Sequence, residues 1–409
     1  RSYKFSLLTL SGDDRPVDEA EFVFFALDVG DLADPERRFT LKPEDFALLN
    51  PNTGTCPVFR TRRDAEITEG IYRRVPVLVK DGDPNGNPWG FKGQLMFMMS
   101  ADSHLFRTRE ELEAEGWTLQ GNHFVRGEER YLPLYEGKMA HHFDHRWATF
   151  DGEDFREVSP VEKRDPAFTV MPRYWVPMGE VETRAPGRQW FCGWRAISRS
   201  TDERTFIGSV IPWSGAGNTF RLFRATSEQF VLSVIIQSSS FIQDFVARVK
   251  FGGTHATLTA VKQLPALHLN EGDIRFVRAA IAELAYTAWD MAGFATFLGC
   301  SSPPFIWNAE RRALIRAELD ALMFRAYGIR RDDVEYIMET FPIVKRRDEA
   351  EFGEYRTKRL ILERYDAMVG AEASGRTYET ILEPPPADPS LAHPESTRPS
   401  WVRAAVPAR

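Results

Sequence analysis

The first apolar stretches of the chain are short and almost continuous. Residues Tyr3–Leu10 and Phe22–Leu27 carry aliphatic and aromatic side chains without a clean alternation with polar ones. Runs of this kind are typical of strands that are buried on both faces of an α/β sheet. The pattern that follows predicts helices over Lys42–Leu49 and Arg62–Arg74. We therefore expect residues 1–80 to form the end of an α/β sheet.

The next segment, residues 81–165, mixes turn-rich loops with short regular elements. The apolar run Gln94–Met99 predicts a strand, and an acidic stretch predicts a helix over Thr108–Glu115. Polar side chains concentrate in residues 132–146, and Ser159–Asp165 has the composition of a linker. We interpret the segment as a connection that leads into the first part of a following domain.

Residues 166–270 are dominated by β-forming runs. Strands are predicted at Tyr174–Val176, Gln189–Ile197, Thr205–Ile211 and Phe220–Phe223. A helix is predicted over Ser227–Gln237, because Thr226 and Gln229 have the spacing of a capping box.

The stretch Ser238–Leu267 closes this β-rich region. An amphipathic helix runs into Arg248 and Lys250 and stops at Gly252–Gly253, as cations and glycine do at a helix C-terminus. Residues Thr254–Val261 then predict a short strand. A basic helix end followed by a double glycine allows the backbone to approach a phosphate closely. The spacing alone favours an ordinary helix–turn–strand with a glycine C-cap.

Residues 271–370 follow helical periodicity. Helices are predicted at Ile274–Thr287, Ala309–Tyr327, Arg331–Thr340 and Glu354–Met368. Residues 371–409 are rich in proline, which indicates a flexible or surface-draped tail. The whole pattern predicts an α+β protein with a remnant of an α/β sheet, a β-rich domain and a helical C-terminal region.

The charge of the chain is unevenly distributed. The formal net charge is −7, which by itself argues against a nucleic-acid partner. Between Met171 and Pro265, however, there are eleven Lys and Arg residues against six Asp and Glu, so this segment carries +5 and the remainder −12. Partners respond to local fields, so a basic module in an acidic protein remains compatible with DNA binding.

Composition narrows the class of protein further. Hydrophobic residues make up 43% and charged residues 27% of the sequence, which is typical of a soluble globular protein, and no apolar run approaches the length of a membrane span. Cys56, Cys192 and Cys300 are widely spaced, which fits a reducing cytoplasm. Because Arg1 starts neither a signal peptide nor an initiator sequence, we expect a fragment of a longer protein.

A histidine-rich segment is the main candidate for a metal site. His141, His142, Asp144 and His145 lie close together, and a His pair at i, i+4 on a helix can share a zinc ion. The general-base Glu expected between them is missing from H-H-F-D-H. A hydrogen-bonded polar turn or a DNA-facing loop is therefore favoured over a metallohydrolase at His141 and His145.

Basic and aromatic residues alternate between Trp190 and Thr205. Arg195 and Arg199 lie among serine and threonine residues that can donate hydrogen bonds to phosphates, and arginine is the side chain that most often reads guanine. A solvated hairpin with structural tryptophans explains the same pattern.

Several blocks resemble the C-terminal half of large adenine-N6 DNA methylases of type IIG restriction–modification and phage-defence systems. They are L-N-P-N-T-G-T-C-P-V-F-R (49–60), L-Y-E-G-K-M-A-H-H-F-D-H-R (134–146), S-R-S-T-D-E-R-T (198–205), F-I-Q-D-F-V-A-R-V-K-F-G-G-T-H (241–255), V-K-Q-L-P (261–265) and A-E-L-D-A-L-M-F-R-A-Y-G-I (317–329). They occur in the order of the family and span most of residues 1–368.

The resemblance implies that residues 1–80 end a methylase core and that residues 166–270 are a target-recognition domain that reads duplex DNA. Residues 271–370 would be a helical spacer that packs against the methylase core of the same polypeptide. The S-adenosylmethionine loop and the Asn-Pro-Pro-aromatic motif of the family are absent, so this chain alone is not expected to methylate DNA. S-adenosylmethionine is implied only for the longer protein.

We therefore expect a cytoplasmic DNA-recognition module, without a catalytic, cofactor or metal site of its own. The candidate DNA-binding residues are Lys138, His141, His142, Arg146, Arg173, Arg195, Arg199, Arg204, Lys250, Gly252, Gly253, Thr254, His255 and Lys262. The alternative is a protein-interaction scaffold that docks other defence-system subunits and touches DNA weakly.

Overall fold

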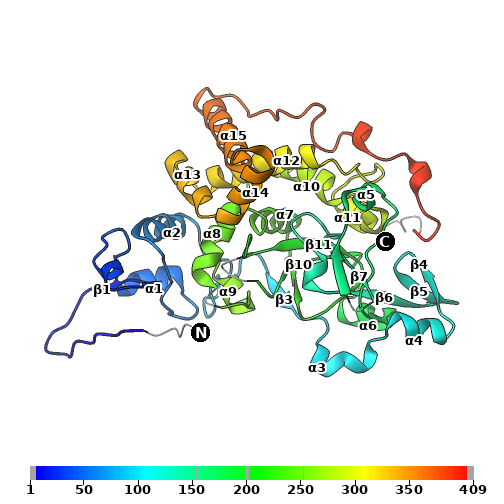
Figure 1. Ribbon diagram of the computed structural model, residues 1–409, viewed down its shortest axis with the longest axis horizontal. Helices are drawn as coiled ribbons and strands as arrows, with labels where there is room; N and C mark the ends of the chain where they lie inside the picture. The colour runs from blue at the N-terminus through cyan, green and yellow to red at the C-terminus, as the bar shows by residue number, and fades with distance from the viewer. Residues whose placement is uncertain (1–5, 153, 199–201, 252, 403–409) are drawn as a thin grey trace. The chain divides into compact units, whose positions relative to one another are not determined.

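The chain divides into two compact units, Arg1–Arg74 and Val75–Arg409. The computed structural model describes residues 6–152, 154–198, 202–251 and 253–402 (Figure 1). Helix accounts for 41% and strand for 16% of the chain, in several small, mainly antiparallel sheets, so the predicted α+β class is confirmed. The predicted boundary near residue 80 lies close to the observed division, whereas those near 165 and 270 fall inside the second unit.

The first unit consists of a two-stranded sheet and two helices around a small aromatic core. Strands β1 (Ala20–Phe22) and β2 (Phe39–Leu41) pair antiparallel, and the predicted helices are present as α1 (Pro43–Leu49) and α2 (Arg62–Arg74). The aromatic core consists of five rings in mutual contact, from the two strands, from α1 and from the loops beside them: Phe22, Phe24, Phe39, Phe46 and Phe59.

The two strands predicted at the start of this unit, Tyr3–Leu10 and Phe22–Leu27, are largely absent from the residues that the structure describes, which do not include residues 3–5. Residues 6–10 form no strand, and Leu7, Leu8 and Leu10 are about four-fifths exposed. The run from Phe22 leaves the β1 ladder at once, since Phe25 has a φ of 57°. With no neighbouring strand on either side, these apolar residues cannot be buried in a parallel sheet. The structure thus does not confirm a remnant of a methylase sheet in residues 1–80, and that remnant stays a prediction.

The second unit contains two packed sheets. The first has the order β11-β10-β13-β3 and the second β12-β6-β5-β4, with β9 also paired to β6. Among the strand pairs of the described residues in this unit, β12–β6 is the parallel one. The strands are β3 (Lys92–Gln94), β4 (Thr118–Gln120), β5 (His123–Arg126), β6 (Glu129–Tyr135), β9 (Trp175–Pro177), β10 (Trp190–Arg195), β11 (Gly208–Pro212), β12 (Gly215–Ala216) and β13 (Phe220–Arg224). A separate hairpin joins β7 (Ala148–Asp151) to β8 (Asp154–Glu157).

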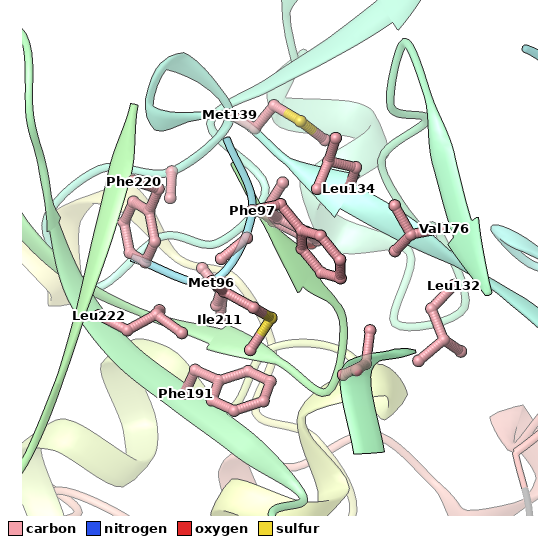
Figure 2. Close-up of a cluster of buried hydrophobic side chains, with 14 of the residues drawn as sticks. Met96, Phe97, Leu132, Leu134, Met139, Val176, Phe191, Ile211, Phe220 and Leu222 are labelled. Carbon is pink, nitrogen blue, oxygen red and sulfur yellow. The ribbon is translucent and has the colours of Figure 1, made fainter. Parts of the chain in front are cut away.

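The apolar core of this unit lies where the two sheets meet (Figure 2). Phe97 forms a bridge with Gly217 and brings the segment after β3 into the core, where it is fully buried. Side chains from both sheets surround it, among them Met96, Leu132, Leu134, Val176, Phe191, Ile211, Phe220 and Leu222. Each such side chain contributes about 1.5–3 kcal/mol when it leaves water.

Helices cover the sheets, and the longer ones follow β13 in the chain (Figure 1). They are α7 (Glu228–Gln237), α8 (Phe241–Lys250), α9 (Leu258–Lys262), α10 (Glu271–Ala285), α11 (Ala292–Phe297), α12 (Ala309–Ala326), α13 (Arg331–Glu339), α14 (Pro342–Phe352) and α15 (Arg356–Ala373). Shorter helices precede them: α3 (Met99–Asp102), α4 (Arg109–Ala114), α5 (Pro160–Arg164) and α6 (Met178–Arg184). The helical C-terminal region predicted from the sequence is confirmed.

Several local predictions are wrong, and side-chain capping explains most of them. Residues Thr254–Val261 do not form a strand, because the Thr257 hydroxyl accepts from the Ala260 amide and starts α9. The predicted linker Ser159–Asp165 is helix α5, which Ser159 and Glu162 cap reciprocally. Two further corrections concern strand and cap positions. The predicted strand at Gln94–Met99 ends at Gln94, and Ser227 rather than Thr226 caps α7.

The proline-rich tail is draped over the helices of the second unit. Glu318, which is fully buried on α12, accepts from the Tyr378 hydroxyl at 2.6 Å, the Thr380 hydroxyl at 2.8 Å and the Ile381 amide at 3.0 Å. Further along, the Ala387 amide donates to Glu283 at 3.0 Å. For the part of the tail that the structure describes, which ends at residue 402, the surface-draped alternative applies.

We predict that Glu318→Ala releases the tail. Three donors lose their acceptor, so we expect the free energy of unfolding to fall by about 2–4 kcal/mol, and trypsin to cleave more quickly after Arg376. Limited proteolysis and urea unfolding measure both effects. The exposed Glu363→Ala, which removes the same charge from α15, is the control. Equal cleavage rates in the two variants would contradict the role of Glu318.

Candidate nucleic-acid interface

Two of the predicted DNA-binding cations meet on an aromatic surface. The Lys138 Nζ lies 4.5 Å from the ring centre of Phe150 and 4.4 Å from that of Phe155, and the Arg173 guanidinium lies 5.0 Å from Phe150. Phe155, on β8, is 54% exposed. We call Lys138, Phe150, Phe155 and Arg173 the basic–aromatic patch. Glu136, 3.8 Å from Lys138, is the nearest acidic partner of its ammonium group.

A tight turn positions Lys138 in this patch. Lys138 is the middle residue of the 3-10 turn Gly137–Met139. The first residue of this turn must be glycine, because a Cβ at Gly137 would lie 2.4 Å from the carbonyl oxygen of Thr219. Arg195, at the end of β10, donates from Nε to the Ala140 carbonyl at 2.7 Å and so supports the turn.

Arg195 is less available to DNA than its sequence context predicts. It is half-buried, and burial lowers the pKa of its guanidinium to about 10. Its hydrogen bond to the turn makes it a support for Lys138. Arg199, the other predicted base reader, lies outside the described residues.

The turn that was predicted to approach a phosphate is exposed over the residues that the structure describes. Gly253, Thr254 and His255 are all exposed, and the Thr254 hydroxyl lies 3.0 Å from His255 Nδ1. The Ser198 amide donates to the Thr254 carbonyl at 3.0 Å, which fixes the turn beside the chain that continues from β10. Gly252 lies outside the described residues. Thr254 and His255 thus present polar groups near the same strand end as Arg195.

Two lysines predicted beside this turn are not free surface cations. Burial lowers the pKa of Lys250 to about 7, so about half of its amines are neutral at that pH. Lys262 donates to the Asp81 carboxylate at 2.8 Å, and that ion pair offsets its charge. Burial therefore argues against the predicted phosphate contact of Lys250, whereas that of Lys262 stays a prediction, because an exposed ion pair is weak enough to exchange its carboxylate for a phosphate.

The prediction that Arg146 contacts DNA is wrong. Its side chain is fully buried, and its guanidinium donates to the carbonyl oxygens of Lys163, Asp165, Phe168 and Thr287 at 2.8–3.1 Å and to the Thr287 hydroxyl at 3.2 Å. These acceptors leave no room for a phosphate. Arg146 instead joins the turn before β7 to α5 and to the segment after α10.

The neighbouring histidines are also structural. His142 is buried with Nε2 3.0 Å from the Phe206 carbonyl, and His145 Nε2 lies 2.9 Å from Asp290 Oδ1. Asp144 accepts from Lys163 at 2.7 Å. Within the described ranges, no three His, Cys, Asp or Glu side chains are grouped as metal ligands. The hydrogen-bonded polar turn is the alternative that the geometry favours over a DNA-facing loop.

Arg204 is likewise buried, which excludes its predicted contact with DNA. It is 2% exposed, donates from Nε to Asp244 Oδ2 at 2.7 Å, and stacks on Phe241 at 4.1 Å. Asp244 also accepts from the amides of Thr205 and Phe206 at 2.7 and 2.8 Å. Arg204 and Thr205 thus anchor the loop before β11 to helix α8.

A cavity that the sequence did not reveal lies beside these buried groups. It has a volume of about 350 Å³ and is lined by His141, His142, Arg204, Trp307, Arg312, Arg316 and Asp320, among others. Arg312, Arg316 and Asp320 are spaced by four on α12 and so share one helical face. This spacing of charged residues is the sequence signal that could have indicated the cavity. We call this site the charged cavity; it includes His141, a predicted DNA contact, which is half-buried.

Comparisons with known proteins add no family to this picture, since neither the protein-family models nor the curated proteins contain a match to this chain. Within the described residues, no single helix has both the length and the apolar character needed to cross a membrane. Helices α7 and α8 reach that threshold only as a pair, bent by 75°.

We predict that Arg146→Lys destabilises the second unit. One ammonium cannot satisfy carbonyl acceptors on several segments, so we expect a loss of about 3 kcal/mol in the free energy of unfolding. Chemical denaturation measures it. Arg188→Lys, at an exposed position before β10, is the matched control and should change stability by less than about 0.5 kcal/mol. A similar loss in both variants would count against the structural role of Arg146.

The buried carboxyl of Asp320 predicts a dependence of stability on pH. Burial raises its pKa from 3.8 to about 6. Between these values the folded chain keeps a proton that the unfolded chain has released, so this group's contribution to stability falls as pH rises. We expect the stability of Asp320→Asn relative to the original chain to improve by about 2 kcal/mol between pH 4 and pH 7. Urea unfolding across that range measures it, and a constant difference would refute the raised pKa.

Proposed function

We propose that this chain recognises duplex DNA, as the target-recognition part of an adenine-N6 DNA methylase of a restriction–modification or phage-defence system. The observation that carries the proposal is the basic–aromatic patch, where Lys138 and Arg173 lie against Phe150 and the exposed Phe155. It is supported by the family-like blocks that contain Lys138 and His255.

The patch combines the two kinds of group that DNA backbones select. Ammonium and guanidinium groups neutralise phosphates and release condensed counterions. An aromatic ring beside them offers a face for sugars or unpaired bases and holds the cations in place. Thr254 and His255 would add hydrogen bonds to the backbone, which orient a protein on the duplex without reading its sequence.

Methyl transfer is not assigned to this chain. No S-adenosylmethionine loop is recognisable among the motifs of the sequence. The proposal therefore concerns recognition, with the catalytic motifs outside this chain and the methylase core of the same polypeptide as its partner.

The test is the salt dependence of DNA binding. We expect the affinity of the chain for a duplex to fall steeply with added salt, and the double variant Lys138→Ala with Arg173→Ala to lower the log–log slope by about 1.8, since each phosphate contact contributes about 0.9. Fluorescence anisotropy with a labelled duplex measures both. Arg331→Ala with Arg359→Ala, which removes the same charge from exposed positions on α13 and α15, is the control. Equal slopes in the two double variants would exclude the patch.

One observation favours the alternative of a protein-interaction scaffold. The first unit exposes a series of aliphatic side chains, including Leu7 at 83%, Leu8 at 79% and Leu27 at 94%. Exposed apolar runs of this kind mark surfaces that bind proteins. Failure of the chain to bind DNA at low salt would favour a protein partner, such as another subunit of a defence system, over the DNA proposal.

A further inference from the structure

Opposite charges balance one another in the lining of the charged cavity. Six Lys and Arg side chains line it, and so do six Asp and Glu side chains. The lining as a whole therefore selects neither an anion nor a cation. What the cavity can bind depends on the charged groups that lack a partner in the protein and face the open space.

Most of these charged groups already have partners. Five of the six cations donate to carboxylates or carbonyl oxygens of the protein: Lys163, Arg204, Arg312, Arg347 and Arg356. Four of the six carboxylates accept from side chains or from a backbone amide: Asp144, Glu203, Glu310 and Asp348. Glu351 is exposed and therefore hydrated. Arg316 and Asp320 remain.

Arg316 lies on α12 with an unpaired guanidinium group. The side chain is half-buried and lines the cavity, but it makes no hydrogen bond or ion pair to any residue that the structure describes. The negative charges of Asp320 and Glu203 attract it from a distance, and the positive charges of Arg204 and Arg347 repel it. A guanidinium carries five N–H donors, so those of Arg316 are left to water or to a ligand in the cavity.

Asp320 lies one helical turn further along α12, and one of its two carboxylate oxygens is unpaired. Oδ1 accepts from the Phe241 amide at 2.8 Å, whereas Oδ2 has no hydrogen-bond partner among the described residues. Oδ2 is not one of the unpartnered atoms that the protein seals from solvent, so it has accessible surface, and Asp320 lines the cavity. Burial raises the pKa of this carboxyl to about 6, which means that the cations around it do not compensate for its loss of water.

Arg316 and Asp320 together suit a ligand with two opposite charges. Residues four apart on a helix have Cβ atoms about 5–6 Å apart, so one small molecule can reach both side chains. Asp320 repels a simple anion and Arg316 repels a simple cation. A ligand that carries a carboxylate and an ammonium group side by side satisfies both residues. Its carboxylate also matches the planar fork of donors on a guanidinium.

An α-amino acid carries this pair of charges on a single carbon atom. Other parts of the lining offer apolar contacts for its side chain, from Phe241, Val344, Leu360 and Ile361. The cavity volume of about 350 Å³ is at the small end of the range for small-molecule sites. Charge, lining and size therefore agree on one class of ligand.

We propose that the charged cavity binds a free α-amino acid with an apolar side chain. The ligand carboxylate accepts from Arg316, and its ammonium group donates to Asp320 Oδ2. This site goes beyond DNA recognition and does not rest on it.

The ligand requirement is tested by calorimetric titration of the full chain at neutral pH. The titrants are L-leucine, L-phenylalanine and two analogues of leucine, namely 4-methylpentanoate, which lacks the ammonium group, and 3-methylbutylamine, which lacks the carboxylate. We expect leucine or phenylalanine to bind at least about tenfold more tightly than either analogue, because each analogue leaves one charged group of the site unpaired. Equal affinity for an analogue, or no binding of either amino acid, overturns the proposal.

The residue assignment is tested with Arg316→Gln and Asp320→Asn. Each removes one charge, and the asparagine oxygen can still accept from the Phe241 amide, so we expect both variants to fold and to bind the amino acid about tenfold or more weakly. Arg346→Gln and Asp366→Asn remove the same charges at exposed positions outside the cavity and should bind normally. Normal binding by either cavity variant, or equal losses in the controls, contradicts the assignment.

The analogues separate a lost charge from a distorted cavity. Asp320→Asn should bind 4-methylpentanoate at least as tightly as the original chain does, because the variant no longer repels a carboxylate. Arg316→Gln should likewise keep its affinity for 3-methylbutylamine. Weaker binding of the matched analogue in either variant would mean that the cavity itself has changed, and would remove the support for a direct contact with the ligand.

A last variant separates this site from the DNA interface. Lys138→Ala with Arg173→Ala should bind the amino acid normally, because neither residue lines the cavity. Loss of amino-acid binding in this double variant would overturn a separate cavity site. The result does not depend on whether the DNA proposal holds.

Discussion

A single guanidinium without access to water organises the second unit. The Arg146 side chain draws together carbonyl groups from α5, from the loop after it and from the end of the α10 segment. Because an unpaired buried guanidinium is strongly destabilising, these segments keep their arrangement as long as Arg146 keeps its charge. The negative charges of Asp290 and Asp144 support that charge. Both candidate sites border this turn, the patch through β7 and the charged cavity through His141.

Buried carboxylates perform the same task elsewhere in the unit. Asp244 holds residues 204–206 against α8, Asp290 holds His145, and Glu318 holds the tail. In each case an acid on or beside a helix satisfies donors from a segment distant in sequence. Apolar burial supplies most of the stabilisation, but it is not directional. The polar contacts fix which loop lies where, and therefore where Lys138 and Arg204 end up.

The sequence could predict the helices well and the exposure of its cations poorly. Helical periodicity predicted α2, α10, α12 and α15, because the residues on the buried face of a helix recur every three to four positions in the sequence. Arg146 and Arg204 looked like surface cations, since nothing in their neighbourhood shows acceptors that lie, for Arg146, as far away as Thr287. The strand predicted at Thr254–Val261 is wrong for a different reason: Thr257 caps helix α9, and this cap outweighs the β propensity of the segment. The charged cavity needed three-dimensional information, because its walls come from loops and helices up to 220 residues apart, from His141 to Ile361.

The draped tail has a consequence for how the protein is made. Glu318 and Glu283 lie on helices that leave the ribosome well before residues 378–387, which supply their tail donors. Until then, Glu318 lacks the partners that compensate for its burial, so α12 cannot reach its final stability before residues 378–381 have been translated. The order of synthesis therefore sets the order of assembly: the helical layer forms first, and it reaches full stability only after residues 378–387 have docked on it.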